Sequence, residues 1–155
     1  MLVRRVRLEE WPRLREIRLR ALADAPYAFG TTYGDTVHQP EEYWHRMLDD
    51  PVWVAEEEDR WVGMVRASEE DGAAHLISMW VEPEARGRGI GRALVEAMVD
   101  WARERAVPAV RLWVAEANAA AEALFLSAGF VDTGERQPLP SNPSVSEIGM
   151  RLPLR

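Results

Sequence analysis

The sequence predicts an α/β fold of the α+β type, with helices on the faces of a mixed, mostly antiparallel central sheet. Segments with strand character alternate with segments of helical periodicity, in the order strand, helix, helix, three strands, helix, strand, helix, two strands. This order predicts about six to seven strands and about four helices. The 155 residues contain no internal repeat and suit one hydrophobic core, so we expect residues 1–155 to form a single domain.

The first half of the chain predicts two helices and four strands. Residues 9–12 (EEWP) begin the first helix, because acidic residues and proline are favoured in a first helical turn. Residues 24–39 have no clear period and carry aromatic residues, which is typical of a functional loop. The second helix runs from Pro40 through Leu48. The arginines of the first helix are expected on its solvated sides: Arg13, Arg15, Arg18 and Arg20. The strands are expected at 3–8, 52–57, 60–68 and 73–81.

The second half predicts two amphipathic helices and three strands. Apolar residues at helical spacing predict helices over residues 89–105 and 117–128. Gly129 suits a left-handed C-cap of the second helix. The proline-rich residues 138–143 are expected to form a loop between the last two strands. The strands of this half are expected at 110–115, 130–133 and 147–152.

Composition argues against several classes of function. The net charge of −7 disfavours a general nucleic-acid surface. The chain has no cysteine, which excludes disulfides, thiolate metal sites and a cysteine nucleophile. No run of apolar residues is long enough for a transmembrane helix, and the first residues lack an apolar signal core. We therefore expect a cytoplasmic protein with no metal, no nucleic-acid partner and no membrane partner.

The segment Arg-Gly-Arg-Gly-Ile-Gly from Arg86 to Gly91 follows a strand and begins a helix. Glycines let the backbone approach a ligand closely, and the free amides and dipole of a helix start attract phosphate oxygens. Arg88 and Arg92 add positive charge with Arg86. A Walker loop requires a lysine, and the chain has none. The dinucleotide fingerprint requires a third glycine that is absent here. A glycine-rich turn without a ligand would not explain the three arginines.

Two blocks of the sequence resemble the GNAT superfamily of N-acetyltransferases. The family loop Arg/Gln-x-x-Gly-x-Gly/Ala is matched by Arg86, Gly89 and Gly91. The second block, Asn-x-x-Ala-x-x-Leu-Tyr followed by Gly-Phe, is present with phenylalanine in place of tyrosine. The resemblance covers residues 2 to about 152 and is strong from residue 73 to residue 130. The matched residues of the second block are Asn118, Ala121, Leu124, Phe125, Gly129 and Phe130.

The resemblance implies a sheet whose fourth and fifth strands splay apart, with acyl-CoA in the resulting cleft. The pantetheine arm is then expected on the backbone of Met79, Trp80 and Val81. A backbone amide of the same strand, that of Met79 or Trp80, is expected to stabilise the oxyanion. The pyrophosphate is expected on the amides of Gly87, Arg88, Gly89, Ile90, Gly91 and Arg92.

Two residues of the second block carry further expectations. The resemblance implies that Asn118 hydrogen-bonds the cofactor arm, although an asparagine at a helix start is also a common N-cap. Phe125 lies at the position where the family usually has a tyrosine that acts as the general acid. Its ring can pack against the cofactor sulfur or against the core. Because Phe125 has no proton to donate, three alternatives remain open. Water or Ser127 protonates the leaving thiolate, or no acid is needed because a thiol has a pKa of about 8.5, or activity is weak or lost.

Transfer to an amine also requires a group that removes a proton. His75 is the first candidate, because histidine titrates near neutrality and family members often carry Glu or His eleven residues before Arg86. A polar residue at a strand start is an equal explanation of His75. Glu82 is the second candidate, although its position predicts an exposed strand end. His38 and His45 are weaker candidates.

The resemblance implies an acetyl-CoA-dependent N-acetyltransferase that moves an acetyl group directly to a small-molecule or peptide amine within a ternary complex. A non-catalytic acyl-CoA-binding or regulatory module and a plain interaction domain are the alternatives. Homodimers are common in the family, and seven tryptophans leave room for an apolar interface, but neither fact decides the oligomeric state. Residues 24–48 and 137–146 are expected to build the acceptor site, where acids and aromatics would suit a cationic amine. The acids and aromatics expected there are Tyr27, Phe29, Tyr33, Asp35, Glu41, Glu42 and Trp44.

Overall fold

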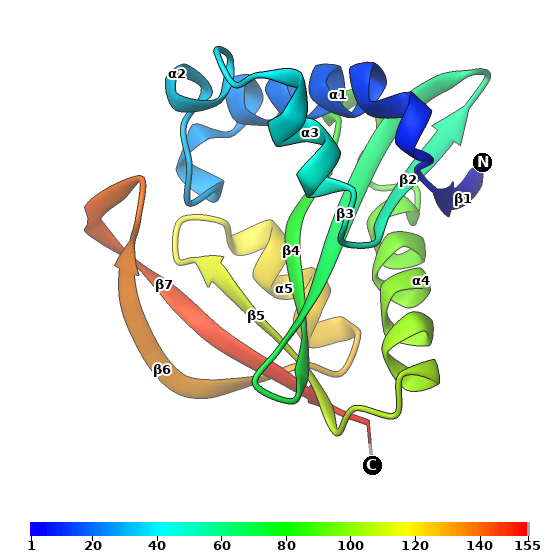
Figure 1. Cartoon of the computed structure of the whole chain (residues 1–155). Coiled ribbons are helices and arrows are strands. Elements are labelled where there is room, and N and C mark those ends of the chain that lie inside the picture. Colours follow the sequence, from blue (N-terminus) through cyan, green and yellow to red (C-terminus); the bar gives the residue numbers. More distant parts are fainter. Residues whose placement is uncertain (155) are drawn as a thin grey trace.

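Residues 1–154, which the computed structural model describes, form one seven-stranded sheet with helices on both faces (Figure 1). The expected α+β fold is confirmed. The strands are β1 (Leu2–Arg5), β2 (Val52–Glu57), β3 (Arg60–Glu70), β4 (Ala73–Val81), β5 (Ala109–Ala115), β6 (Val131–Leu139) and β7 (Asn142–Pro153). The α-helices are α1 (Trp11–Asp24), α2 (Tyr33–Thr36), α3 (Glu41–Met47), α4 (Ile90–Glu104) and α5 (Ala119–Ser127), and the 3-10 helices are η1 (Leu8–Glu10), η2 (Pro26–Ala28) and η3 (Pro83–Ala85).

The strands lie in the order β1-β2-β3-β4-β5-β7-β6. Neighbouring strands are antiparallel except β4 and β5, which run parallel. Within residues 1–154, the β4–β5 pairing is limited to Ala74 opposite Val110 and His75 opposite Arg111. The two strands therefore part after His75, and the carboxyl half of β4 has an edge that β5 does not cover.

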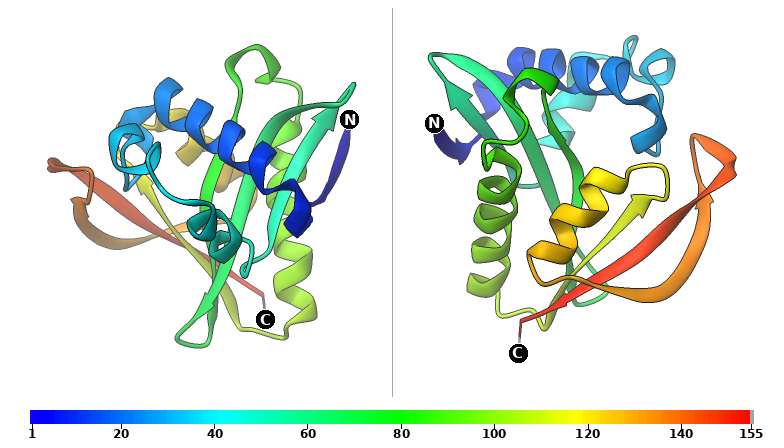
Figure 2. Two further views of the ribbon diagram at one scale, coloured as in Figure 1. Left: turned by 45° about the horizontal axis from the view of Figure 1, so that its top comes forward. Right: turned by 180° about the vertical axis from the view of Figure 1, so that it is seen from behind.

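Helices α4 and α5 cover one face of the sheet, and α1 to α3 cover the other (Figure 2). The amphipathic pattern of α4 explains its position, because its apolar stripe packs onto β2, β3 and β5. Gly63 on β3 lets α4 approach closely, since a Cβ there would lie 3.1 Å from Leu94 Cδ1. On the other face, Leu14 and Ile17 of α1 pack with Trp44 of α3.

Three expectations about the elements were wrong. Strand β1 ends at Arg5 instead of residue 8, because the chain turns into η1, where Glu10 accepts hydrogen bonds from Arg4 and from the Arg7 amide. The loop at residues 24–39 contains η2 and α2, and the Thr32 hydroxyl caps α2.

The third wrong expectation concerns the segment between the last two strands. Strands β6 and β7 form a continuous hairpin that turns at Pro140 and Ser141, so most of the expected proline-rich loop is strand. The prolines are tolerated for reasons of position. Pro138 lies on the edge strand β6, and Pro143 lies in the part of β7 that extends beyond β5.

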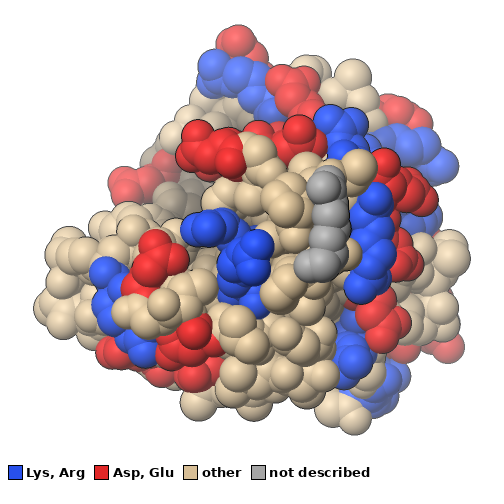
Figure 3. All heavy atoms as spheres, turned by 90° about the horizontal axis from the view of Figure 1, so that it is seen from below, with Lys and Arg blue, Asp and Glu red and all other residues tan. Residues whose placement is uncertain are grey.

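Charged side chains of both signs are interspersed on the face seen in Figure 3. Ion pairs such as Arg105–Glu69, at 2.9 Å, and Arg111–Glu135, at 3.9 Å, join side chains of opposite charge on the surface. In the part of the chain that is described, no helix has the length and apolar character needed to cross a membrane.

Candidate active site

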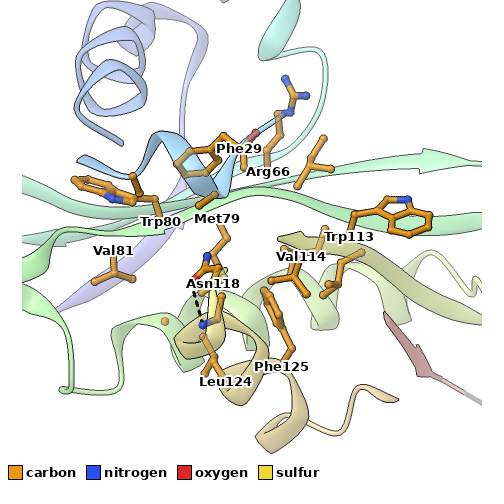
Figure 4. A pocket seen from close by; sticks show the side chains of 18 of the residues that line it. Phe29, Arg66, Met79, Trp80, Val81, Trp113, Val114, Asn118, Leu124 and Phe125 are labelled. Carbon is orange, nitrogen blue, oxygen red and sulfur yellow. Dashed lines mark hydrogen bonds between the residues drawn. The ribbon is translucent and has the colours of Figure 1, made fainter. Parts of the chain in front are cut away.

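A cavity of about 770 Å³ opens where β4 and β5 part. It passes between the two strands, so residues from both faces of the sheet line it. Figure 4 shows Phe29 and Arg66 on one side of the strand that carries Met79 and Trp80, and Asn118, Leu124 and Phe125 on the other. The cavity therefore joins a compartment beside α4 and α5 to a second compartment beneath α1 and α3.

The backbone of β4 is distorted where it lines this cavity. Met64 pairs with Trp80 while Arg66 pairs with Ile77, so two residues of β4 oppose one residue of β3. This irregularity is a β-bulge, and Ser78 within it has a φ of +57°. A bulge turns backbone groups away from the regular ladder, and β5 does not cover this edge of β4. Met79, Trp80 and Val81 line the cavity along this uncovered edge, where the pantetheine arm is predicted to lie, and the Val81 carbonyl already accepts a hydrogen bond from Arg86 Nε at 2.9 Å.

The start of α4 forms the mouth of the compartment beside α5. Gly87 and Gly89 line the cavity and have φ values of +79° and +83°. No described protein atom lies within 4 Å of the position that a Cβ on either glycine would take. The first N–H groups of α4 lack intrahelical acceptors, and among the described residues no side chain caps the helix start. These features fit the pyrophosphate of coenzyme A, because free amides face a space that a side chain would fill.

The arginines of this loop have different roles. Arg86 lines the cavity, and its guanidinium is anchored to the Val81 carbonyl and to Asp24, both at 2.9 Å. Arg92 also lines the cavity. The Arg88 side chain instead makes a bidentate ion pair with Glu57 of β2 and does not reach the cavity. Arg88 can therefore contribute its backbone amide, whereas its guanidinium stabilises the loop from outside.

Helix α5 contributes Asn118 and Phe125 to the same compartment. Asn118 caps the helix, because its Oδ1 accepts a hydrogen bond from the Ala121 amide at 3.3 Å. Its side-chain NH₂ group has no partner within residues 1–154 and is free for a ligand. Phe125 is buried and packs edge-on against Phe130, with ring centroids 5.7 Å apart. Ser127 lies outside the cavity lining and donates its hydroxyl proton to a carbonyl of its own helix, so it is badly placed to serve as an acid.

The second compartment lies over the opposite face of the sheet. His75 of β4 and Glu147 of β7 both line it, and their registers place them on the same face as Trp113 of β5. Glu147 is buried and accepts a hydrogen bond from Gln137 Nε2 at 2.5 Å. His75 is half-buried at the last β4–β5 pair. Two proton-accepting side chains therefore line this compartment, His75 where the strands begin to part and Glu147 opposite Ala115 at the far end of β5.

Glu82, the second candidate base, has a different environment from the one expected. The expectation that Glu82 lies at an exposed strand end was wrong, because Glu82 is buried. It also lies outside the cavity lining. Its carboxylate accepts hydrogen bonds from Arg60, at 2.7 Å, and from Arg20. The hydrogen bond from Arg60 is the main cause that lowers the pKa of Glu82. A carboxylate held in this way has a structural role and is a weak proton acceptor.

The acidic side chains expected around the acceptor site do not line the cavity. Asp35, Glu41 and Glu42 are exposed on the outer surface, and Trp44 is fully buried in the core. Tyr27 and Phe29 do line the second compartment, as expected. The weaker histidine candidates also lie outside the lining: His38 is exposed, and His45 lies 3.2 Å from Glu41.

Known proteins that are similar to this chain identify the family to which it belongs. Residues 11–130 match the model of the Acetyltransferase (GNAT) family. The chain belongs to the GNAT acetyltransferase family. The resemblance of the two sequence blocks is therefore confirmed. A mycothiol acetyltransferase from Thermobispora bispora is 35% identical over 123 residues, which are 74% of this chain and 40% of that protein. The chain spans about two fifths of the length of the curated relatives that match it over most of its own length.

Solved structures of this GNAT fold superimpose over nearly the whole chain. A ribosomal-protein-alanine N-acetyltransferase from Brucella melitensis has a TM-score of 0.79 at 27% identity, with 99% of this chain and 100% of that chain covered. The structure of yncA from Salmonella typhimurium, which holds its cofactor acetyl-CoA, has a TM-score of 0.83 at 22% identity, with 100% and 94% covered. This second likeness supports the fold alone.

Among the cavity-lining residues that sequence reasoning did not place in the site are Arg18, Arg66, Ser78 and Glu147. One signal was present for Arg18, which lies four residues from both Leu14 and Leu22 on the buried stripe of α1. Its expected solvated position was wrong. The other three residues give no local signal, because the register between distant strands brings them to the cavity.

Proposed function

We propose that this protein is an acetyl-CoA-dependent N-acetyltransferase that transfers the acetyl group directly to an amine held in the same cavity. The single observation that carries the proposal is the continuous cavity through the sheet. It joins the amide-rich start of α4 to the compartment that contains His75 and Glu147. Holding both reactants in one cleft removes the need for a covalent enzyme intermediate.

In the proposed reaction, acetyl-CoA lies along β4 and α5, with its pyrophosphate on the amides at the start of α4. The amine nitrogen attacks the thioester carbonyl carbon, the C–N bond forms and the C–S bond breaks. His75 accepts the proton that the ammonium loses before the attack, and the second proton, which the nitrogen loses after the C–N bond has formed, passes to solvent water. The backbone around the Ser78 bulge supplies an amide to the developing oxyanion. CoA leaves as a thiolate beside Phe125, without an acid, since the pKa of a thiol is about 8.5.

The names of similar proteins do not fix the acceptor. One similar protein is named for mycothiol and another for a ribosomal protein alanine. A small-molecule amine and a peptide amine both remain predictions for this chain. Cytoplasmic location and homodimer formation also stay predictions.

Calorimetric titration with acetyl-CoA tests the binding step. Gly89→Ala places a methyl group in the proposed phosphate site, so affinity is expected to fall by about tenfold or more, which is 1.4 kcal/mol. Gly72→Ala is the matched control, because Gly72 has a φ of +74°, open space around it and a place in a distant turn. Both variants carry the same backbone strain, and the control is expected to bind like the wild type. Absence of acyl-CoA binding to the wild type would overturn the proposal.

A thiol-release assay over a diverse amine panel tests the transfer step. His75→Gln is expected to lower kcat by about 10² to 10⁴, the usual effect of losing a general base. Unchanged turnover would remove His75 as the base and direct attention to Glu147. Binding of acetyl-CoA without turnover of any amine would instead favour the second candidate, a non-catalytic acyl-CoA-binding module, for which Phe125 in the tyrosine position is the specific observation.

A further inference from the structure

Arg18 is a buried cation that faces the second compartment of the cavity. It is 5% exposed, although it lies on a surface helix. Its Nε and Nη1 atoms have no hydrogen-bond partner, and no described carboxylate forms an ion pair with it. Other arginines of α1 are satisfied: Arg15 donates to the Val37 carbonyl, and Arg20 pairs with Glu82. Arg18 is therefore a fixed charge without a counter-ion among residues 1–154.

The electrostatic environment of Arg18 is unfavourable to its charge. Burial is the main cause that lowers the pKa of Arg18 to about 10, and the like charge of Arg66 lowers it further. The group is still protonated at neutral pH. A buried charge without a partner destabilises a protein strongly, so such a group persists where a ligand supplies the missing charge.

The surroundings of Arg18 hold its guanidinium in place. Its Cζ lies 4.6 Å from the centroid of the Phe29 ring. Phe29 is fixed in turn, because its carbonyl accepts a hydrogen bond from the Ser141 hydroxyl at the tip of the β6–β7 hairpin. Pro140 of the same tip packs against Gly30. The tip of the hairpin thus lines the cavity and supports the segment that carries Phe29.

Arg66 adds a second positive charge to the same compartment. It projects from β3, on the sheet face that also carries His75. Its nearest acidic group is Asp50, at 4.0 Å, and its Nε has no hydrogen-bond partner in the described chain. Two incompletely paired guanidinium groups lining one cavity match the two oxygens of a carboxylate.

We propose that the amine acceptor is an amino carboxylic acid, whose carboxylate is bound by Arg18 and Arg66. This inference rests on the proposed function. Glu147 is the one acidic side chain that lines the cavity in the described residues, and the strand registers place it on the same sheet face as His75. Cationic and anionic ends of the acceptor are thus matched by opposite charges in the site. A cationic amine without an acid group would instead meet the unpaired Arg18 and the incompletely paired Arg66.

Matched substrates test the inference. Glycine, β-alanine and the other common amino acids are each assayed for thiol release beside their carboxamides, which keep the amine and lose the charge. The acid is expected to exceed its amide by about 10²-fold or more in kcat/KM, because the amide leaves buried guanidinium groups unpaired. Amides or simple amines acetylated as efficiently as the acids, or more so, would overturn the inference while leaving the proposed function intact.

Arg18→Met isolates the residue. The variant is expected to reduce the ratio of acid to amide kcat/KM to below about tenfold, whereas Arg18→Lys keeps the charge and an intermediate ratio. The matched control is Arg46→Met, because Arg46 is exposed on α3, lies outside the cavity lining and has no ion pair within residues 1–154. The control is expected to keep the wild-type ratio. A wild-type ratio in Arg18→Met would contradict the proposed contact.

Thermal stability without ligands provides a readout independent of turnover. Replacing an uncompensated buried charge with an apolar side chain of similar length is expected to raise Tm above that of wild type and Arg46→Met. A Tm equal to or below that of Arg46→Met would mean that Arg18 is satisfied by the fold, and would overturn the inference. If no amine is acetylated at all, the proposed function fails. The Tm comparison of Arg18→Met with Arg46→Met then decides only whether Arg18 is an uncompensated buried charge.

Discussion

Asn118 shows how one side chain can combine structure and binding. Its Oδ1 atom caps α5, and its free NH₂ group lines the compartment beside α4. The observed N-cap and the proposed cofactor contact, which sequence reasoning treated as alternatives, would use different atoms of the same amide. The two roles can therefore be separated by substitution.

Asn118→Ala removes both groups, whereas Asn118→Asp keeps the capping oxygen and removes the NH₂ donor. Asn118→Ala is expected to lower the free energy of unfolding by about 1 kcal/mol, and Asn118→Asp by no more than a few tenths. Both variants are expected to weaken acetyl-CoA binding several-fold, since each loses one hydrogen bond. Denaturant unfolding and calorimetry check the two effects. Wild-type affinity in Asn118→Asp would show that the NH₂ group does not contact the cofactor.

At the scale of elements, the close packing of α4 on the sheet fixes the position of the glycine-rich loop at the start of this helix. Gly63 sits under the helix, and a Cβ there would lie 3.1 Å from both Leu94 Cδ1 and the Trp80 carbonyl oxygen. The side chain of leucine can move, but the backbone oxygen of β4 cannot move without disturbing the cavity edge. A glycine in β3 therefore links helix packing to the geometry of β4.

Gly63→Ala is expected to lower the free energy of unfolding by about 1–3 kcal/mol through overpacking. The control is Gly34→Ala in α2, where no described atom lies within 4 Å of the added Cβ. The control is expected to leave stability unchanged or slightly higher, because alanine restricts the unfolded chain. Thermal unfolding of both variants measures the difference. Equal stability of the two variants would mean that α4 can shift on the sheet without cost.

At the scale of the whole molecule, arginine–carboxylate pairs shape stability in acid. The hydrogen bond from Arg4 lowers the pKa of Glu10 from 4.5 to about 2. The hydrogen bond from Arg136 lowers the pKa of Asp132 from 3.8 to about 2. Because these folded-state values lie below the unfolded ones, the pairs stabilise the native state above pH 4.5. That contribution is lost as pH falls from 4.5 toward 2.

Glu10→Gln is expected to lower Tm at pH 7, because the bidentate contact with Arg4 is lost. The Tm difference from wild type should shrink as pH falls from 4.5 toward 2, where wild-type Glu10 becomes protonated. Calorimetric scans from pH 7 to pH 2 measure this difference. Glu70→Gln is the control, since Glu70 is exposed and has no ion pair in the described residues. A difference that stays constant with pH would contradict the assignment of Glu10.

Much of the fold was predictable from the sequence, because its signals are local. The stripe of α4, the C-cap at Gly129 and the order of strands depend on neighbouring residues, and each was found within a few positions. The hairpin β6–β7 was underestimated because Pro138 and Pro143 read as loop residues. A strand tolerates a proline where no neighbouring strand needs the missing N–H group. The sequence alone does not show which side of each strand has a neighbouring strand.

The sequence by itself determined the order of the strands and of the longer helices, the family, and the loop that we expect to bind a phosphate-bearing cofactor. Glycines and arginines adjacent in the chain act on one helix start, so no distant contact is needed to recognise them. Only the tertiary structure revealed the second compartment of the cavity, where we propose that the acceptor binds. Arg18, Arg66 and Glu147 come from α1, β3 and β7, and they meet because β4 and β5 part after a single short pairing. That pairing is set by the register of distant strands, whereas Arg18 is buried because it lies on the stripe of α1 that packs against the core.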